Sequence, residues 1–390
     1  HRTHKPGVGG STPPPATNIS EFVIKKFLQQ IFKNISYFFF FKVYGKVERS
    51  ILINEDNRIK VSSLEMDGDL KYKVYKITDG RLYTDRIHNT AALLENKIIE
   101  GPSFQLKFNN YSPISNNIVF EKGTPRRLKN LKGAVLSLLT GGGGNSNYWH
   151  WLYDVLPRLR LCEKTKKISE VDYFILPSLE KKFQNETLRE LKIDKKKILS
   201  SENYRHVKAN ELIFTDHPYI FTGDSHKDAQ NIPEWIINWL KEKFLLNMKI
   251  VSGNYPKNIF IDRTDPKSDT SKVRSIVNEN EIKNLLNKKN FKFVRLHELS
   301  FVDQVQYFNN ADCIIGLHGA GFANLSFCKS NTKVIEFRMN ETGKVIENLA
   351  KKNNLKFDSI ICEVEKANFG IQSGHIKIPL SILEEKMNNI

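Results

Sequence analysis

The stretch 311–337, ADCIIGLHGAGFANLSFCKSNTKVIEF, decides the fold of this chain. It holds an apolar run of strand length at Cys313–Gly316, a helical pattern at Gly321–Phe327 and a second apolar run at Lys333–Phe337. Strands that alternate with helices are typical of β-α-β units, in which helices cover a parallel sheet. The stretch therefore predicts an α/β fold with a parallel sheet.

The same alternation continues on both sides of this stretch. In the C-terminal half we expect strands at Asn258–Ile261, Lys292–Arg295, Cys313–Gly316, Lys333–Phe337 and Phe357–Ile361, and helices at Val273–Asn287, Phe301–Asn309, Gly321–Phe327 and Thr342–Lys352. In the N-terminal half we expect strands at Ala134–Leu139, Asp172–Leu176 and Glu211–Phe214, and helices at Trp151–Leu161, Leu179–Leu191 and Pro233–Leu245. Leu246–Tyr255 separates the two sets. The pattern predicts two α/β halves, each with a parallel sheet, joined by a short linker.

A β-rich region precedes the first α/β half. We expect strands at Ser50–Ile53, Ile59–Ser63, Tyr72–Ile77, Ala91–Ile99 and Ile118–Glu121, because Asp-Gly, Asn and Gly-Pro turns separate these segments. We accordingly place an N-terminal domain at 46–250, β-rich over 46–130 and α/β over 131–250. A C-terminal α/β domain at 251–365 follows, and 366–390 is expected to be a helix that returns to the N-terminal domain.

The first 45 residues differ from the rest. Residues 1–20 lack an initiator Met, are rich in Pro, Gly and Thr, and are interpreted as an expression remnant or a disordered segment. Residues 21–45 include Phe22–Val43, FVIKKFLQQIFKNISYFFFFKV, which mixes bulky apolar residues with lysines. Two interpretations fit this segment: an amphipathic helix on an anionic bilayer, with peripheral membrane contact through 22–43, or a core helix followed by a strand.

Composition excludes several classes of protein. The 390 residues are 40% hydrophobic, enough to fill a core, so a wholly disordered chain is excluded. The four cysteines include no C-x-x-C pair, which favours a reducing compartment over a disulfide framework. The net charge of +17 suits anionic partners, but the lysines are spread along the chain rather than gathered in one block. We therefore expect no nucleic-acid partner.

Ligands of open parallel sheets bind beyond the carboxyl ends of the strands. In the C-terminal half, the most informative of these ends is Leu317-His318-Gly319-Ala320-Gly321. Its small residues allow a ligand to approach the backbone, and the helix that follows presents free N–H groups to an anion. This combination favours a nucleotide-diphosphate site, although turn glycines at the edge of a domain are the alternative.

Neighbouring strand ends add charged side chains. Arg263 has the geometry to pair with phosphate oxygens, and Arg274 adds countercharge. Glu336 is expected to accept hydrogen bonds from ribose hydroxyls. The alternative is that these are solvated charges, but their position at adjoining strand ends favours the ligand site.

The N-terminal half contributes a second cluster. Thr140–Asn147, TGGGGNSN, precedes YWHWLYDVLPR at 148–158. If Ser146 or Asn147 caps the helix, His150 and Asp154 lie on one face near its start, as in a carboxylate-oriented general base. A buried histidine and an aspartate placed by the helix dipole are the alternative.

A further polar cluster follows another strand end. Thr215–His217, with Gly223–His226, either lines an acceptor site or forms a polar loop.

These motifs together resemble glycosyltransferase family 61. The pieces that carry the resemblance are Tyr148–Arg158, Ile261–Arg263 with Arg274, Asn278 and Glu279, Gly316–Asn324, and Val334–Glu336, in this order over about Leu136–Lys356. The resemblance implies a GT-B fold, two Rossmann-like domains that face each other across a cleft, and inverting sugar transfer without a metal. It implies that the C-terminal half binds a nucleotide sugar, with UDP as the favoured nucleotide, and that the N-terminal half binds a glycan or lipid-linked glycan acceptor.

The residues and the resemblance together give a full set of roles. His150 is assigned as the base and Asp154 as its orienter, with Asp154 itself left open as the base. The nucleotide-sugar residues are Arg263, Arg274, His318, Gly319, Ala320, Gly321, Asn324 and Glu336, and the acceptor residues are Asn147, Tyr148, Arg158, Asp224 and His226. We expect polysaccharide or capsule biosynthesis, in the cytoplasm or peripherally on the inner membrane face, or in the secretory-pathway lumen if the source is eukaryotic.

Other functions stay open at this stage. Asp67-Gly68-Asp69 has the D-x-D form of metal-dependent sugar transferases, but a tight turn between strands explains it better. No H-E-x-x-H motif, EF-hand or Cys/His cluster is present in the sequence, so no metal or cofactor is expected. A nucleotide-sugar-binding protein without turnover and a basic nucleic-acid-binding protein are the alternative functions.

Overall fold

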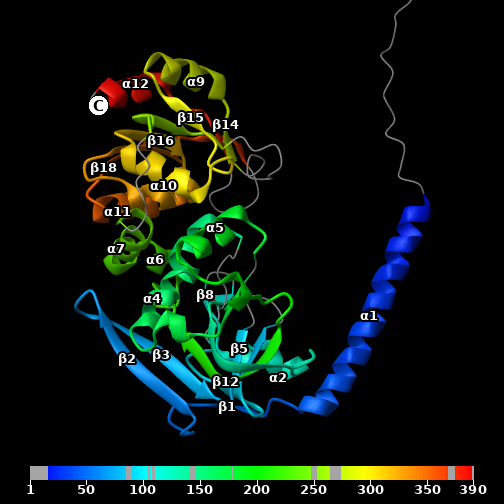
Figure 1. The fold of residues 1–390 in the computed structure, drawn as a ribbon. Helices are drawn as coiled ribbons and strands as arrows, with labels where there is room; N and C mark the ends of the chain where they lie inside the picture. Colours follow the sequence, from blue (N-terminus) through cyan, green and yellow to red (C-terminus); the bar gives the residue numbers. More distant parts are fainter. Residues whose placement is uncertain are drawn as a thin grey trace, which may run out of the picture.

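A computed structural model describes residues 16–84, 90–103, 106–107, 110–139, 146–177, 179–246, 253–263, 274–367 and 374–388. The predicted glycine-rich loop at 140–145 lies outside the described residues. The two halves of the chain are stacked, with the C-terminal half above the N-terminal half in Figure 1. Within the described residues, no helix combines the length and the apolar composition needed to cross a membrane.

The N-terminal half is built on a ten-stranded mixed sheet. Its strands are β1 (Arg49–Ile51), β2 (Ile59–Met66), β3 (Leu70–Thr78), β4 (Arg81–Thr84), β5 (Thr90–Leu94), β6 (Lys97–Ile99), β9 (Lys129–Ser137), β10 (Tyr173–Leu176), β11 (Ile198–Ser200) and β12 (His206–Thr215). The order β12-β9-β10-β11 is parallel throughout, whereas β12 pairs antiparallel with β3 and β4. The β-rich region is therefore an extension of the α/β sheet rather than a separate layer. A short hairpin, β7 (Leu106–Lys107) with β8 (Asn110–Tyr111), stands apart from the sheet.

The helices of this half mostly follow the parallel strands. They are α1 (Ala16–Tyr44), α2 (Ile118–Lys122), α3 (Tyr148–His150), a π-helix at Trp151–Val155, α4 (Pro157–Glu163), α5 (Lys182–Glu190), α6 (Ser225–Ala229), α7 (Glu234–Lys241) and a second π-helix at Glu242–Leu246, with 3-10 turns at Ile114–Asn116, Ile168–Glu170 and Lys195–Lys197. The crossover from β9 to β10 contains α3, the first π-helix and α4.

The C-terminal half is a doubly wound parallel sheet. Its strands β13 (Asn258–Ile261), β15 (Lys292–Val294), β16 (Cys313–Leu317), β17 (Lys333–Arg338) and β18 (Lys356–Ile361) pair in the order β15-β13-β16-β17-β18. The helices are α9 (Glu279–Lys288), α10 (Phe301–Asn310), the 3-10 helices η6 (Ala320–Phe327) and η7 (Asn340–Thr342), α11 (Val345–Lys352) and α12 (Leu380–Asn388). Successive residues Ile314 and Ile315 of β16 enter different hydrophobic clusters, because strand side chains alternate between the two faces. Both faces of the sheet are therefore buried under helices.

The α/β class with parallel sheets is confirmed, but several local predictions were wrong. Ile118–Glu121 is helical in α2, because the Asn117 side chain accepts a hydrogen bond from Val119 N and caps the helix. Ala91–Ile99 splits into β5 and β6 at Glu95, whose φ is 53°. The predicted turn at Asp67-Gly68 is confirmed between β2 and β3, since both residues have positive φ.

Other corrections concern the ends of elements in the C-terminal half and at the N-terminus. The predicted helix at Val273–Asn287 begins at Glu279, because Arg274–Ile276 (β14) pairs with β20 (Gly374–Ile376) in a small sheet that β19 (Val364–Ala367) completes. The predicted helix at Gly321–Phe327 is a 3-10 helix. Phe22–Val43 lies in one continuous helix with no strand, and α1 begins at Ala16, inside the segment we had set aside as a remnant.

The C-terminal helix α12 does not return to the N-terminal half. Its Leu383 and Met387 pack in the cluster that contains Phe260 and Phe337 of the C-terminal sheet. Lys386 Nζ also donates to Asp358 Oδ1 at 2.7 Å, on the neighbouring β18. The prediction was wrong because the apolar side of α12 covers a face of the C-terminal sheet, which belongs to the same half of the chain.

One continuous hydrophobic cluster joins the two halves. It contains Trp151 and Tyr153 from the N-terminal half and Phe322 and Phe327 from the C-terminal half. Within it the buried Tyr153 hydroxyl group bonds to Ala323 O at 2.9 Å and Ser326 Oγ at 2.6 Å. The two halves therefore share one hydrophobic core and are not held together by the linker alone.

We expect Tyr153→Phe to lower the free energy of unfolding by about 1–3 kcal/mol, because it leaves the Ala323 carbonyl group without its donor and the Ser326 hydroxyl group without its partner across the junction. Chemical denaturation of the variant and the wild type measures the difference. Tyr173→Phe is the control, since it removes a hydroxyl group from a partly buried tyrosine that packs against the N-terminal core away from the junction. Equal effects of the two changes would contradict a specific role for Tyr153.

Candidate active site

The site in the C-terminal half lies where the strand connections diverge. β13 is flanked by β15 on one side and β16 on the other, so the loops after β13 and β16 leave a crevice at the carboxyl edge of the sheet. Arg263 follows β13, and His318 follows β16. The fold therefore brings these two predicted residues together, although 55 positions separate them in the sequence.

Two guanidinium groups meet at this edge. Arg263 Nη1 and Arg274 Nη1 both donate to the backbone oxygen of His318, the second at 2.7 Å. Burial, together with the charge of Arg274, lowers the pKa of Arg263 to about 10. Among the described residues no carboxylate forms a salt bridge with either arginine, and Arg274 Nε is buried without a hydrogen-bond partner. The pair thus presents a concentrated positive charge that suits an anion.

The turn after β16 closes around Arg263. A Cβ atom placed on Gly319 would lie 2.6 Å from Arg263 Nη1, closer than side chains approach one another. A side chain at this position would therefore push the Arg263 guanidinium away from where it now lies against the His318 carbonyl. Gly319, Ala320 and Gly321 also line a cavity of about 270 Å³ together with Arg263 and with Tyr148 from the N-terminal half.

Two of the predicted ligand residues form hydrogen bonds with other side chains of the protein. Glu336 is 1% exposed, and its Oε1 accepts a hydrogen bond from His318 Nδ1. Asn324 is fully buried, and its Oδ1 accepts from the Tyr148 hydroxyl group at 2.7 Å. We had assigned Glu336 to ribose hydroxyls, but the structure gives it His318 as its partner, so it orients that imidazole. Asn324 links the two halves.

The N-terminal half has an equivalent edge between β9 and β12. These adjacent parallel strands end near α3 and at Thr215, so the helix that carries His150 stands beside the residues after β12. Asn147 caps α3 as predicted, because its side chain accepts from Trp149 N at 2.9 Å. Its capping role fixes the direction in which α3 leaves the sheet.

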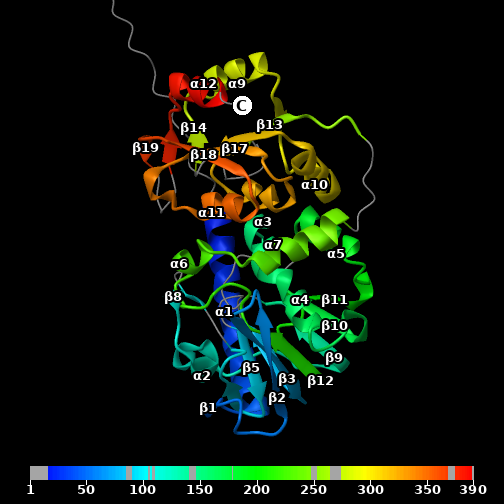
Figure 2. The same cartoon turned by 90° about the vertical axis from the view of Figure 1, so that its left-hand side faces the viewer.

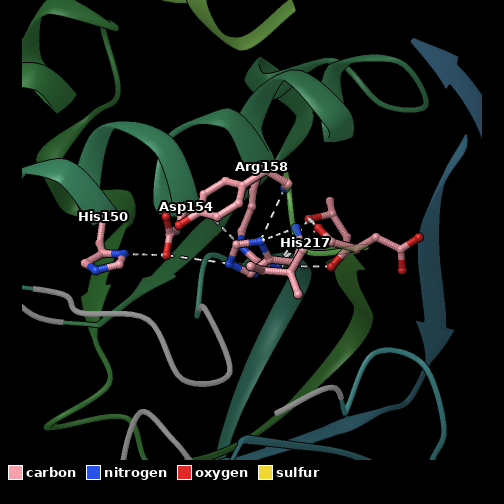
Figure 3. A network of polar contacts seen from close by, with 8 residues as sticks. His150, Asp154, Arg158 and His217 are labelled. Atoms are coloured by element: carbon pink, nitrogen blue, oxygen red, sulfur yellow. Dashed lines mark hydrogen bonds and ion pairs between the residues drawn. The ribbon is translucent and has the colours of Figure 1, made fainter. Parts of the chain in front are cut away.

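His150 and Asp154 form the predicted pair (Figure 3). His150 Nδ1 lies 2.8 Å from Asp154 Oδ2, and the carboxylate is 2% exposed, whereas the His150 side chain is 37% exposed. Burial would lower the pKa of His150, but the charge and the hydrogen bond of Asp154 outweigh it, so this pKa lies above its ordinary value. Burial would raise the pKa of Asp154, but the two neighbouring histidines hold it well below its usual range.

His217 is the member of this network that sequence reasoning did not connect with Asp154. Its Nε2 lies 3.6 Å from Asp154 Oδ2, on the other side of that oxygen from His150 (Figure 3). His217 Nδ1 accepts from Tyr219 N at 3.3 Å and from Ile220 N at 3.2 Å, so the proton of a neutral ring is on Nε2 and faces Asp154. The sequence did indicate that His217 follows the end of a strand, now β12, at which a ligand could bind.

The remaining predicted acceptor residues have structural partners. Arg158 is 5% exposed, and its guanidinium donates to Asp154 O at 3.1 Å and Thr215 O at 3.0 Å, so it ties the helical segment that carries Asp154 to the end of β12. Asp224 caps α6 by accepting from His226 N and Lys227 N, and both Asp224 and His226 are exposed. Tyr148 is the one of this set that lines the cavity.

The two edges meet near the cavity but do not both open into it. Tyr148, two residues before His150, and Gly319–Gly321, directly after His318, are lining residues, whereas neither histidine is. Among the described residues, no group of three or more His, Cys, Asp or Glu side chains is placed to hold a metal ion.

Residues 148–335 match the family model described as Glycosyltransferase 61. This match supports membership of glycosyltransferase family 61. No curated protein matches the chain in a sequence search. The matched segment of this glycosyltransferase begins at Tyr148, includes the His150–Asp154 pair, Arg263 and the turn at Gly319, and ends one residue before Glu336. Its α1 helix and its β-rich region lie outside the match.

Gly319→Ala tests whether the turn positions Arg263. We expect the variant to fold but to bind nucleoside diphosphate about tenfold or more weakly, because the added methyl group displaces the guanidinium and each tenfold is ~1.4 kcal/mol. Isothermal titration calorimetry with UDP measures the change. Ala320→Ser, at the next position of the same turn, is the control. Unchanged binding by Gly319→Ala would show that the turn does not position Arg263 for anion binding.

Proposed function

We propose that this glycosyltransferase moves a sugar from a nucleotide sugar, with UDP as the favoured nucleotide, to the hydroxyl group of a glycan, with inversion and without a metal. The observation that carries this proposal is the pair of partly buried guanidinium groups at the carboxyl edge of the C-terminal sheet, which have no carboxylate partner within the part of the chain that the structure describes. Charge of this kind suits a diphosphate, and it supplies the countercharge that a divalent cation gives in other transferases.

We assign the donor to the C-terminal half and the acceptor to the N-terminal half, in a GT-B arrangement. The cavity shared by Tyr148 and Gly319–Gly321 supports this assignment, because a donor bound at Arg263 would lie next to the start of α3. The His150 side chain is at the other end of that short helix. A sugar held at this junction is positioned between the two edges.

The reaction that we propose needs one base and one anion site. The acceptor hydroxyl proton passes to His150 Nε2 as its oxygen forms a bond to the anomeric carbon. The bond from that carbon to the phosphate oxygen breaks, and its electrons leave with the nucleoside diphosphate. Arg263, Arg274 and the backbone N–H groups at the start of η6 stabilise this charge.

His150 suits the role of base better than Asp154 does. Asp154 is buried, and its Oδ2 already contacts His150 Nδ1 at 2.8 Å and His217 Nε2 at 3.6 Å. That carboxylate holds the proton of His150 on Nδ1, which leaves Nε2 as the acceptor of a proton. His217 and Arg158 are positioning residues, since both act on Asp154 or on its backbone rather than on a substrate.

The pH dependence of turnover tests the identity of the base. We expect kcat/KM to fall as the pH drops through the pKa of His150, because only the neutral imidazole accepts a proton. This pKa lies above the ordinary value of 6.5. Asp154→Asn removes the charge that raises it, so the acidic limb should move to lower pH while the plateau falls. An acidic limb that stays in place in Asp154→Asn would mean that another group is the base.

Two variants separate the roles of the halves. Arg263→Ala should weaken UDP binding by about tenfold to a hundredfold, the range for loss of a charge-assisted hydrogen bond. His150→Ala should lower kcat by about 10² to 10⁴ and leave UDP binding unchanged. Calorimetry and a donor-consumption assay measure both. Arg49→Ala, which removes an exposed guanidinium from β1, is the control. The reverse pattern would exchange the assignments of the two halves.

A further inference from the structure

Helix α1 carries an apolar stripe on the side turned away from the protein. Ile24, Leu28, Ile31, Ile35 and Phe38 recur at spacings of four and three residues, which places them on one face of the helix. The large apolar residues of this helix that are 40–72% exposed are Ile24, Phe27, Leu28, Ile31, Phe32, Ile35, Phe38, Phe39 and Val43. We call these nine residues the α1 stripe. A surface helix of a globular domain normally turns such a stripe toward the core.

The opposite side of α1 faces the N-terminal half. The Tyr37 hydroxyl group donates to Glu121 O at 2.9 Å, and Tyr44 stacks edge-on against His206 and accepts from Leu128 N. Gln30, Lys33 and Asn34, on this same side, line a polar groove between α1 and the body of the protein, and Phe32 is the one member of the α1 stripe that also lines it. The contacts thus fix which side of the helix is exposed, and it is the apolar one.

The figures show α1 as a projecting element. It leaves the base of the N-terminal half and runs along the long axis of the molecule beside the body (Figures 1 and 2). Its 29 residues correspond to a length of about 43 Å. A long, exposed apolar stripe on a single helix needs a partner, because uncovered apolar area of this size is rare on soluble proteins.

The charge of α1 distinguishes between the possible partners. Residues 22–44 contain four lysines, Lys25, Lys26, Lys33 and Lys42, and no acidic residue. In a helix pair formed with a second copy, the only carboxylate that the partner α1 helix offers to these four lysines is Glu21, so most of them would have no ion-pair partner on it. An anionic lipid surface supplies the opposite charge along the whole helix, together with an apolar layer for the phenylalanine side chains.

We propose that α1 lies in the plane of an anionic membrane surface, with the α1 stripe at the boundary between headgroups and acyl chains. Lys25 and Lys42, which are three or four residues from Leu28 and Phe38 and so lie on the same side of the helix, are then placed among the lipid phosphates. The body of the protein is held beside the membrane, on the Tyr37 side of the helix. This proposal does not depend on sugar transfer, since it concerns a helix outside the family match.

Vesicle flotation with the full chain tests the proposal. We expect the protein to float with vesicles of phosphatidylcholine and phosphatidylglycerol, to float poorly with phosphatidylcholine alone, and to dissociate as salt screens the lysines. Ile31→Asp combined with Ile35→Asp should reduce binding by more than about a hundredfold, because each change withdraws a large apolar side chain and each tenfold is ~1.4 kcal/mol. Thermal unfolding of the variant should match that of the wild type, since both residues are exposed.

The matched control places the same two charges on the other side of the helix. Gln30→Asp with Asn34→Asp has the same spacing and the same change in charge, and the two side chains at present bond to each other at 3.1 Å. This variant should retain most of the binding. Failure of the wild type to float, or equal loss in both double variants, would overturn the proposal. A wild-type dimer in sedimentation analysis that Ile31→Asp/Ile35→Asp converts to a monomer, without vesicle binding, would identify a second copy as the partner instead.

Discussion

The candidate site depends on a topological constraint that both halves share. In each sheet, one strand lies between two parallel neighbours. The next parallel strand along the chain pairs on one side of it, and a later strand pairs on the other side. These central strands are β9, between β10 and β12, and β13, between β15 and β16. The loops at the carboxyl ends of such strands diverge, and the space between them is open to a ligand. The His150–Asp154 pair and His217 occupy one such edge, and Arg263 and His318 occupy the other.

The electrostatics of the two edges are complementary. At the N-terminal edge a buried carboxylate lies between two imidazoles, so negative charge is held inside and a basic nitrogen is left near the surface. At the C-terminal edge two guanidinium groups converge on one carbonyl oxygen. Partly buried charge of this kind is costly unless a partner is supplied. The first edge supplies that partner within the protein, whereas the second suits a partner that comes with the substrate.

The shared core explains why the two edges can act together. Tyr148 and Tyr153, which flank His150 on successive turns, bond to Asn324 and to Ala323 and Ser326 across the junction. The same helical segment therefore carries the proposed base and anchors the C-terminal half. A displacement of one half would shift His150 relative to the anion site, so the stability of this junction and the geometry of the reaction are coupled.

The sequence by itself determined the local elements and the chemistry at strand ends. Period-two and period-3.6 patterns of apolar residues predicted most of the parallel strands and their helices. The family resemblance was recognisable in the segments YWHWLYDVLPR and GLHGAG. Only the tertiary structure decided which strand ends are neighbours, because strand order depends on packing between segments distant in the chain. It therefore decided that His217 faces Asp154, that Glu336 serves His318, that α12 covers its own sheet, and that the apolar side of α1 faces outward.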